Sequence, residues 1–164
     1  MTRYDVRPST AADVALLEAA MPSRGLDVHR HFHDEQDNGD ITYLTVWADT
    51  EPVGSGVISW LGPHLPPGAL DTHPELKNVG VAPQWRGRGA GTRLIRSAID
   101  VIRDRGCAGV SLGVSVDNDG AARLYERLGF WDTGVRETTA YRYPDDDGVM
   151  QDVVEQDRLL RLDF

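Results

Sequence analysis

The sequence predicts an α/β (α+β) fold in one domain over residues 1–164, with helices packed on a mixed β-sheet. Three observations support this fold class. Strands and helices alternate in the centre of the chain, which is typical of parallel strands joined by a crossover helix. Adjacent strands without a helix between them stand at both ends, which is typical of hairpins. Between these regions, a glycine-rich turn at residues 87–91 joins a strand to a helix.

The composition is that of a water-soluble globular protein. The 164 residues are 40% hydrophobic, and a chain of this length buries roughly 70% of its unfolded surface. The net charge of −9 disfavours nucleic acid as a partner. The sequence has neither an 18-residue apolar run nor an apolar signal segment, so no membrane association is expected. The single cysteine, Cys107, excludes an internal disulfide and fits a cytoplasmic protein.

The N-terminal residues predict a short strand, Tyr4–Arg7, followed by a helix. Pro8 ends the strand, and Ser9 or Thr10 is expected to cap the helix. Pro22–Gly25 ends the helix. The apolar residues of this helix recur at helical spacing and are Val14, Leu17 and Met21.

A histidine-rich segment, Leu26–Asn38, comes next. On a helix His29 and His33 would share one face, as zinc ligands do, but no third ligand is apparent and no metal site is expected. The segment is polar throughout, which predicts a solvated helix or a mobile lid.

Two β-rich runs, Ile41–Trp47 and Pro52–Leu61, predict a hairpin because the four residues between them have turn chemistry. Gly54 and Gly56 in the second run indicate a bulge or the close approach of another backbone. The segment Gly62–Gly68 contains three prolines and predicts an irregular loop.

The strand before the glycine turn is predicted at Glu75–Val81, and Pro83 ends it. A helix is expected to open at Thr92 and to end at a C-cap, Gly106. A bulge in the strand would change which side chains share a face. Simple alternation places Glu75, Lys77, Val79 and Val81 on one face, and Leu76, Asn78 and Gly80 on the other. The apolar face of the helix consists of Leu94, Ile95, Ala98, Ile99 and Ile102.

Strand, glycine turn and helix together predict a site for a diphosphate. Unpaired N–H groups at a helix N-terminus bind anions, and glycine lets the backbone approach the ligand closely. Arg86, Arg88 and Arg93 add positive charge to an otherwise acidic chain. The lysine triplet of a P-loop and the acidic residue of a dinucleotide fingerprint are both missing, which disfavours a nucleotide-binding sensor. The alternative is an ordinary surface turn.

Beyond the central helix the sequence predicts a strand, a helix and two further strands. Asp117, Asn118 and Asp119 offer an N-cap, and Gly129 ends the helix. Val135–Tyr143 is β-rich. The first of these strands alternates at Val110, Leu112, Val114 and Val116, and the helix has Ala121, Leu124, Tyr125 and Leu128 on its apolar face. The last strand, Val153–Phe164, follows the turn Pro144–Gly148 and the residues after it.

Two motifs resemble those of the GNAT superfamily of N-acyltransferases. The run from Val79 to Gly91, V-x-V-x-P-x-x-R-G-x-G-x-G, looks like the family's acyl-CoA-binding motif Q/R-x-x-G-x-G/A, which either Gln84 or Arg86 can open. The run from Asn118 to Phe130, N-x-x-A-x-x-x-Y-x-x-x-G-F, resembles the family's later motif. The resemblance implies one N-acetyltransferase domain over residues 1–164, with a twisted, mostly antiparallel sheet of about six or seven strands and helices on both faces.

The resemblance also implies that acetyl-CoA is the cosubstrate and that no metal is needed. Backbone groups of Val79 and Val81 would pair with its pantetheine arm, and Asn118 would touch the pantetheine or its sulfur. A backbone N–H near Val79 or Gly80 would meet the oxyanion. The pyrophosphate would be held by backbone amides and the Thr92 hydroxyl, in a turn that consists of Arg86, Gly87, Arg88, Gly89, Ala90, Gly91 and Thr92.

Two catalytic roles follow from the same resemblance. Tyr125 looks like the family's general acid, which protonates the departing thiolate, and a phenol with a pKa of about 10 keeps its proton at neutral pH. The alternative role for Tyr125 is a core aromatic beside Leu124 and Leu128. Glu75 lies where some family members keep a general base for the attacking amine, with a water chain as the alternative.

The acceptor implied is a primary amine on a small molecule whose identity the motifs leave open. Three segments are expected to select it: Leu26–Asn38, Gly62–Asp71 and Tyr141–Asp157. Their many acids favour a cationic amine, although a solvated acidic surface explains them equally well. An acyl-CoA-binding module without transferase activity is the alternative function, against which Tyr125 and Asn118 argue. The sequence leaves a homodimer open.

Overall fold

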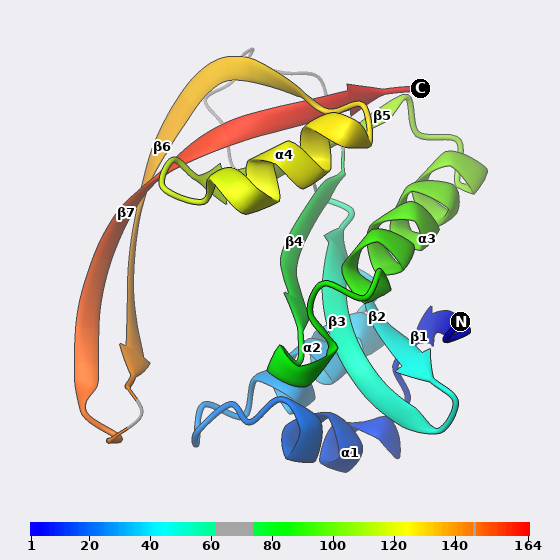
Figure 1. Cartoon of the computed structure of the whole chain (residues 1–164), viewed down its shortest axis with the longest axis vertical. Coiled ribbons are helices and arrows are strands. Elements are labelled where there is room, and N and C mark those ends of the chain that lie inside the picture. Colours follow the sequence, from blue (N-terminus) through cyan, green and yellow to red (C-terminus); the bar gives the residue numbers. More distant parts are fainter. Residues whose placement is uncertain (62–73, 146) are drawn as a thin grey trace.

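The computed structural model describes residues 1–61, 74–145 and 147–164. In these described residues seven strands form one sheet in the order β1-β2-β3-β4-β5-β7-β6, and all neighbours are antiparallel except β4 and β5, which are parallel (Figure 1). The strands are β1 (Tyr4–Pro8), β2 (Ile41–Ala48), β3 (Glu51–Ser59), β4 (Glu75–Val81), β5 (Gly109–Ser115), β6 (Trp131–Pro144) and β7 (Met150–Asp163). The α-helices are α1 (Asp13–Ala20), α2 (Val28–Asp37), α3 (Ala90–Asp104) and α4 (Asp119–Arg127), and a short 3-10 helix covers Pro83–Trp85.

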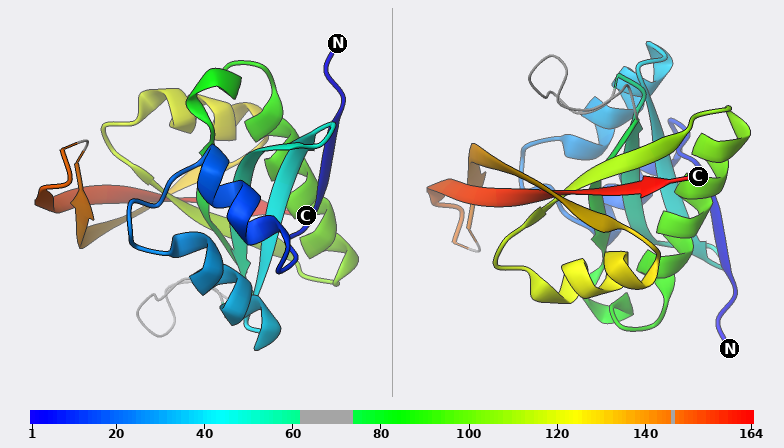
Figure 2. Two further views of the ribbon diagram at one scale, coloured as in Figure 1. Left: turned by 90° about the horizontal axis from the view of Figure 1, so that it is seen from below. Right: turned by 90° about the horizontal axis from the view of Figure 1, so that it is seen from above.

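Two hydrophobic cores place helices on both faces of the sheet (Figure 2). The larger core joins α3 and α4 to one face, where Leu94 and Tyr125 pack with Leu76, Leu112 and Leu160. The smaller core joins α1 and α2 to the other face and is formed by Leu17, Ile41, Tyr43 and Val57, with Met21 and Phe32 packed against it. The predicted fold class, a mixed and mostly antiparallel sheet with helices on both faces, is confirmed.

The start of α1 differs from the prediction that Ser9 or Thr10 caps this helix. The N-cap residue is Ala12, and it makes no side-chain cap. Asp13, in the first turn, instead ties the preceding segment to the helix, since its carboxylate accepts the Thr10 N–H at 2.8 Å and a hydrogen bond from the Arg7 guanidinium at 2.6 Å. The Ser9 hydroxyl instead bonds to the Thr45 hydroxyl on β2.

The histidine segment is a helix, but it is not uniformly solvated as predicted. His29 is 5% exposed, and its ring lies between the Tyr43 hydroxyl at 2.6 Å and the Met21 carbonyl oxygen at 2.7 Å. A carbonyl oxygen can only accept, so Nε2 of His29 carries a proton and donates to it. Phe32 packs on the smaller core from the same helix. Two residues thus fix α2 to β2, although most of the helix is polar.

Strands β2 and β3 form the predicted hairpin, with a two-residue turn at Asp49 and Thr50. Gly54 occupies a close approach of the kind expected, because a Cβ there would lie 2.6 Å from the Gly80 carbonyl oxygen. An adjacent register shift in the pairing of β2 with β3 leaves Val53 as an extra residue in β3. The predicted loop Gly62–Gly68 lies outside the described residues.

A bulge in β4 changes which of its side chains lie on the same face of the sheet. Gly80 pairs with Ser55, whereas Lys77 pairs with Val57, so both Asn78 and Val79 lie opposite Gly56. Asn78 adopts a left-handed backbone with φ of 52°. As a result Leu76, Val79 and Val81 all pack on the larger core, while Glu75, Lys77 and Asn78 line a cavity on the other face. Simple alternation is therefore wrong for this strand.

The C-terminal strands are longer than predicted and form a curved arm. β6 begins at Trp131, before the predicted start at Val135, and β7 begins at Met150, before Val153. Only residues 157–163 of β7 pair with β5, so the outer part of the β6–β7 hairpin extends beyond the sheet and curves away from it (Figure 1).

Candidate active site

The site begins where β4 and β5 diverge. The two strands pair at a single position, Glu75 with Ser111, and beyond it β4 has no strand partner on that side among the described residues. Ala82 donates its N–H to the Val53 carbonyl, so the backbone groups of Val81, one residue earlier, point away from β3 and into the gap. This free strand edge is available for hydrogen bonds to an extended ligand.

The glycine turn lies at the mouth of this gap and presents unpaired amides. α3 begins at Ala90, two residues before the predicted start at Thr92. The first N–H of this helix that donates to a backbone carbonyl is that of Arg93, which donates to Gly89. The six N–H groups from Gly87 to Thr92 have no acceptor among the described residues. Gly87 and Gly89 have φ of 70° and 89°, a backbone region that favours glycine. Such a helix N-terminus is a ready site for an anion.

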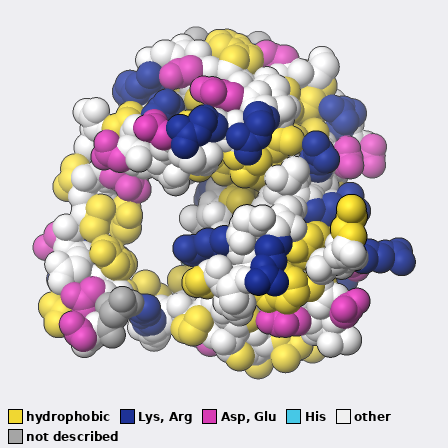
Figure 3. All heavy atoms as spheres, viewed as in Figure 1, with side chains coloured by type: hydrophobic (Ala, Val, Ile, Leu, Met, Phe, Trp, Pro, Cys, Tyr) yellow, Lys and Arg dark blue, Asp and Glu magenta, His cyan; other side chains and the backbone are white. Residues whose placement is uncertain are grey.

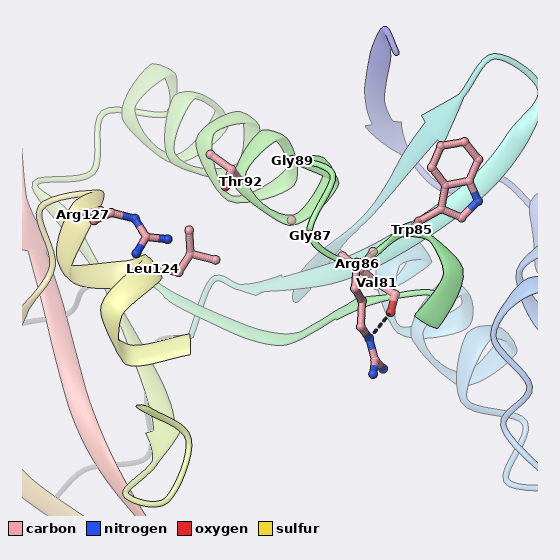
Figure 4. Close-up of a pocket in the computed structure, with 9 residues that line it drawn as sticks. Val81, Trp85, Arg86, Gly87, Gly89, Thr92, Leu124 and Arg127 are labelled. Atoms are coloured by element: carbon pink, nitrogen blue, oxygen red, sulfur yellow. Dashed lines mark hydrogen bonds between the residues drawn. The ribbon is translucent and has the colours of Figure 1, made fainter. Parts of the chain in front are cut away.

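A cavity of about 350 Å³ stands over these amides (Figure 4). Val81, Arg86 and Thr92 line it from the strand and the turn. Leu124 and Arg127 line it from α4 and project toward the side of α3 that carries Thr92. The sequence interpretation missed Arg127, because it occupies an unspecified position of the later motif and only the packing of α4 across the gap brings its guanidinium to the turn.

Contacts with neighbouring residues hold the turn in place. The Tyr4 hydroxyl donates to the Arg88 carbonyl at 3.0 Å, and the Arg88 guanidinium lies 5.5 Å from the centre of the Trp85 ring. The Arg86 Nε donates to the Val81 carbonyl at 3.0 Å (Figure 4). The Arg86 and Arg88 side chains therefore brace the turn, and the amides are the groups that remain for an anion.

Tyr125 and Asn118 line a second cavity of about 320 Å³ between β4 and β5. Tyr125 is 9% exposed, and its hydroxyl forms no hydrogen bond with the described residues. Burial raises its pKa above the ordinary value, so the phenol keeps its proton at neutral pH. Asn118 is the N-cap of α4, and its Oδ1 accepts the Ala121 N–H at 3.1 Å. The side-chain amide NH₂ of Asn118 is then left to reach a ligand.

Glu75 lies in a third cavity, of about 600 Å³, which we call the acceptor cavity. This cavity is formed by the start of β4 and the inner face of the β6–β7 hairpin, and its lining consists of Glu75, Lys77, Asn78, Gly113, Glu137, Thr139, Tyr141, Glu155 and Asp157. Five of these residues also line the cavity that holds Tyr125: Lys77, Asn78, Gly113, Glu155 and Asp157. The structure therefore places the two predicted catalytic residues in adjoining cavities.

The described residues contain no group of three or more histidine, cysteine, aspartate or glutamate side chains placed to hold a metal ion. In the same part of the chain, every helix is too short or too polar to cross a membrane.

The glycine turn, the diverging strands and the buried tyrosine match a known family. The family model described as "Acetyltransferase (GNAT) family" matches residues 13–130. The chain belongs to this family. The predicted family is therefore confirmed, and the match covers both motifs through Phe130.

Individual acetyltransferases resemble parts of the chain. A mycothiol acetyltransferase of Nocardiopsis dassonvillei is 40% identical over 99 residues, which cover 57% of this chain and 29% of that protein. The N-alpha-acetyltransferase RimI of Mycobacterium tuberculosis is 40% identical over 84 residues, covering 51% of this chain and 48% of that protein. The chain thus matches less than half the length of each of these curated relatives.

A solved structure extends the likeness to the whole fold. The ribosomal-protein-alanine N-acetyltransferase of Brucella melitensis superposes with a TM-score of 0.72 at 21% identity, over 98% of this chain and 99% of that one. At this identity the likeness concerns the fold, and it includes the β6–β7 region that the family model does not reach.

Proposed function

We propose that this chain transfers an acetyl group from acetyl-CoA to a primary amine on a small molecule. The observation that carries the proposal is the set of six amides from Gly87 to Thr92, at the mouth of a gap that leads to the hydroxyl of the buried Tyr125. Neither these amides nor this hydroxyl has a hydrogen-bond partner in the part of the chain that the structure describes. A ligand with a diphosphate at one end and a thioester at the other fits this arrangement. Family membership supports the same cosubstrate.

The binding residues follow from this placement. The amides of the turn and the Thr92 hydroxyl hold the pyrophosphate, with Arg127 facing it from α4. The backbone groups of Val79 and the N–H of Val81 pair with the pantetheine arm, as an added strand would. The Val81 carbonyl already accepts a hydrogen bond from Arg86. Asn118 reaches the arm near its sulfur from the start of α4.

The reaction is a direct attack. The neutral amine nitrogen adds to the thioester carbon, and a backbone N–H near Val79 or Gly80 stabilises the resulting oxyanion. The intermediate collapses as the C–S bond breaks, and the thiolate takes the Tyr125 proton. Glu75, or a water chain that runs past it, accepts the proton released by the amine. Tyr125 then recovers a proton from solvent.

A screen of amines with acetyl-CoA, monitored by the release of free thiol, tests this function. Saturable thiol release that depends on both the amine and the protein is the expected result, with mass spectrometry showing the acetylated amine. Binding of acetyl-CoA without transfer to any amine would contradict the proposed activity. It would instead support the alternative, an acyl-CoA-binding module without transferase activity.

The acceptor side of the site favours a cationic molecule. The acceptor cavity contains four carboxylates, from Glu75, Glu137, Glu155 and Asp157, and one ammonium, from Lys77. An excess of carboxylates attracts cations and repels anionic amines such as free amino acids. A monoanionic amine that is acetylated as fast as its uncharged analogue in the same screen would contradict this preference.

A further inference from the structure

The inner face of the β6–β7 hairpin carries an unusual set of charges. Glu137 and Asp157 are direct partners across the two strands, and Thr139 faces Glu155 in the next pair but one. Like charges that face each other across a sheet destabilise it. Glu137, Glu155 and Asp157 are also half-buried, so water and salt screen their mutual repulsion less than at an open surface.

The outer face of the same hairpin provides a comparison within the molecule. There Arg142 faces Asp152 across the strands, and their side-chain atoms lie 2.8 Å apart. Arg136 forms an ion pair with Asp132 at 2.9 Å. Among the described residues, by contrast, the carboxylates of Glu137, Glu155 and Asp157 form no ion pair. A general excess of acid does not explain this difference between two faces of one hairpin.

Neutral neighbours orient these inner carboxylates. The Thr139 hydroxyl donates to Asp157 Oδ2 at 3.1 Å. Burial and the charge of Glu155 raise the pKa of the Tyr141 hydroxyl, so this phenol stays protonated and able to donate. Asp157 and Glu155 are thus held in place by neutral groups and not by cations.

Glu137, Glu155 and Asp157 form an acidic wall, and this wall continues into the cavity that contains Tyr125. Glu155 and Asp157 line both the acceptor cavity and the cavity of Tyr125. Tyr125 is nine-tenths buried, and its hydroxyl lacks a partner among the described residues, which is an independent sign that a ligand completes this region. The space-filling view shows the molecule hollowed between the hairpin arm and the rest of the chain (Figure 3). A molecule with one end at Tyr125 would extend along the carboxylates.

We propose that the acceptor is an aliphatic diamine or polyamine, whose second, protonated amine is bound by Glu137, Glu155 and Asp157 while the first amine is acetylated. This inference rests on the proposed function of the site. The first nitrogen forms the amide bond as the C–S bond breaks, and the second ammonium group does not react. Residues two apart on one strand face, such as Glu155 and Asp157, are about 7 Å apart, so short alkyl spacers suit the wall.

Calorimetric titration of the CoA-bound protein tests the inference without requiring turnover. 1,4-Diaminobutane should bind at least tenfold more tightly than n-butylamine, which has the same chain and lacks the second charge. Equal binding of the two amines, or no binding of either at millimolar concentration, would overturn the inference. A lysine-rich peptide that binds more tightly than every diamine would replace the small molecule with a protein as acceptor.

Turnover separates this inference from the function on which it rests. If both amines are acetylated with equal kcat/KM, the transferase activity stands and the diamine assignment fails. If the diamine binds selectively and no amine is acetylated, the wall recognises diamines and the proposed activity fails.

Substitutions locate the recognition on the wall. In Glu137→Gln and Asp157→Asn the ratio of diamine to monoamine affinity should fall at least fivefold, while stabilisation by acetyl-CoA is retained. Asp152→Asn is the matched control, because it removes a carboxylate from the outer face of the same hairpin, and it should keep the parental ratio. If Asp152→Asn lowers the ratio as much as Glu137→Gln does, the net charge of the protein and not the wall binds diamines, and the inference is wrong.

Discussion

At the scale of single residues, Tyr125 carries the chemical step that is most open to test. Phenylalanine keeps the ring that packs edge-on against Phe130 at 5.7 Å and removes only the proton donor. Tyr125→Phe should therefore fold normally and bind acetyl-CoA within a few-fold of the parent. Its kcat should fall by about 10²-fold, the low end for general acid catalysis, because a thiolate is already a fair leaving group.

Steady-state kinetics with an accepted amine measure this change, and the thermal shift with acetyl-CoA controls for binding. Because burial raises the pKa of Tyr125, the phenol keeps its proton through neutral pH. Deprotonation of Tyr125 should therefore not lower the kcat of the parent until the pH exceeds about 10. A kcat within threefold of the parent would make Tyr125 a core aromatic, and the thiolate proton would then come from water.

The glycine turn gives a second prediction, on whether its backbone amides or its arginine side chains bind the pyrophosphate of acetyl-CoA. Gly89→Asp should abolish acetyl-CoA binding, since φ of 89° strains any residue with a Cβ and the new carboxylate repels the phosphates. Arg88→Ala should weaken binding by less than about tenfold, because this guanidinium stacks on Trp85 and lies outside the lining of the cavity.

Titration calorimetry with CoA measures both variants, and circular dichroism checks that each one folds. An Arg88→Ala variant that loses as much affinity as Gly89→Asp would show that side-chain charge, and not the amides, binds the pyrophosphate.

At the scale of elements, the pair formed by Arg7 and Asp13 joins β1 to the start of α1. The Arg7 guanidinium, with a further hydrogen bond from Thr10, lowers the pKa of Asp13 to about 2. A folded-state pKa below the unfolded value gives stability that is present above about pH 4 and is lost as pH falls toward 2. The shift corresponds to at most about 2 kcal/mol, because the Arg7 side chain is 39% exposed and water screens the pair.

Urea unfolding of Asp13→Asn measures this contribution. The free energy of unfolding should be lower than that of the parent by about 1–2 kcal/mol at pH 7, and the difference should shrink between pH 4 and pH 2. Asp100→Asn is the control, because its pair with Arg103 at 3.5 Å is more than half exposed and should contribute little. A difference that stays constant from pH 7 to pH 2 would show that the ionised pair is not its cause.

Elements also show how far the sequence predicts the structure. The positions of α3, α4 and β5 follow from apolar periodicity and the glycines that end the helices, and the structure agrees within a few residues. The sequence did not predict which side chains of β4 share a face. The bulge in this strand depends on pairing with β3 and on the left-handed backbone of Asn78, and neither produces a periodic pattern in the sequence. The burial of His29 was missed for a related reason, since its partners lie on α1 and β2.

At the scale of the whole molecule, some residues of the site can be named from local motifs, and others are brought together only by the fold. The phosphate turn, Asn118 and Tyr125 were named from local motifs, and the structure places them around one gap between β4 and β5. The acidic wall follows only in part from the sequence, since the segment Tyr141–Asp157, which is expected to select the acceptor, contains Glu155 and Asp157 but not Glu137. Its facing carboxylates come from two strands, and the curvature of the hairpin brings them to the start of β4. Arg127 was missed because α4 reaches the turn only through packing.

The last prediction concerns the stability of the whole fold. Acetyl-CoA is expected to join α3, α4 and the free edge of β4, three elements that share one core, so its binding should stabilise the native state as a unit. At a hundredfold excess over its dissociation constant, a ligand specific for the native state adds about 2.7 kcal/mol. For a chain of this size this corresponds to a rise in Tm on the order of 5–10 °C. Differential scanning fluorimetry measures the shift, with NAD as a control that has a diphosphate but no pantetheine arm. Equal shifts with both ligands would show that the site recognises only the diphosphate. No shift with CoA would contradict the assignment of the gap between β4 and β5 as the acetyl-CoA site.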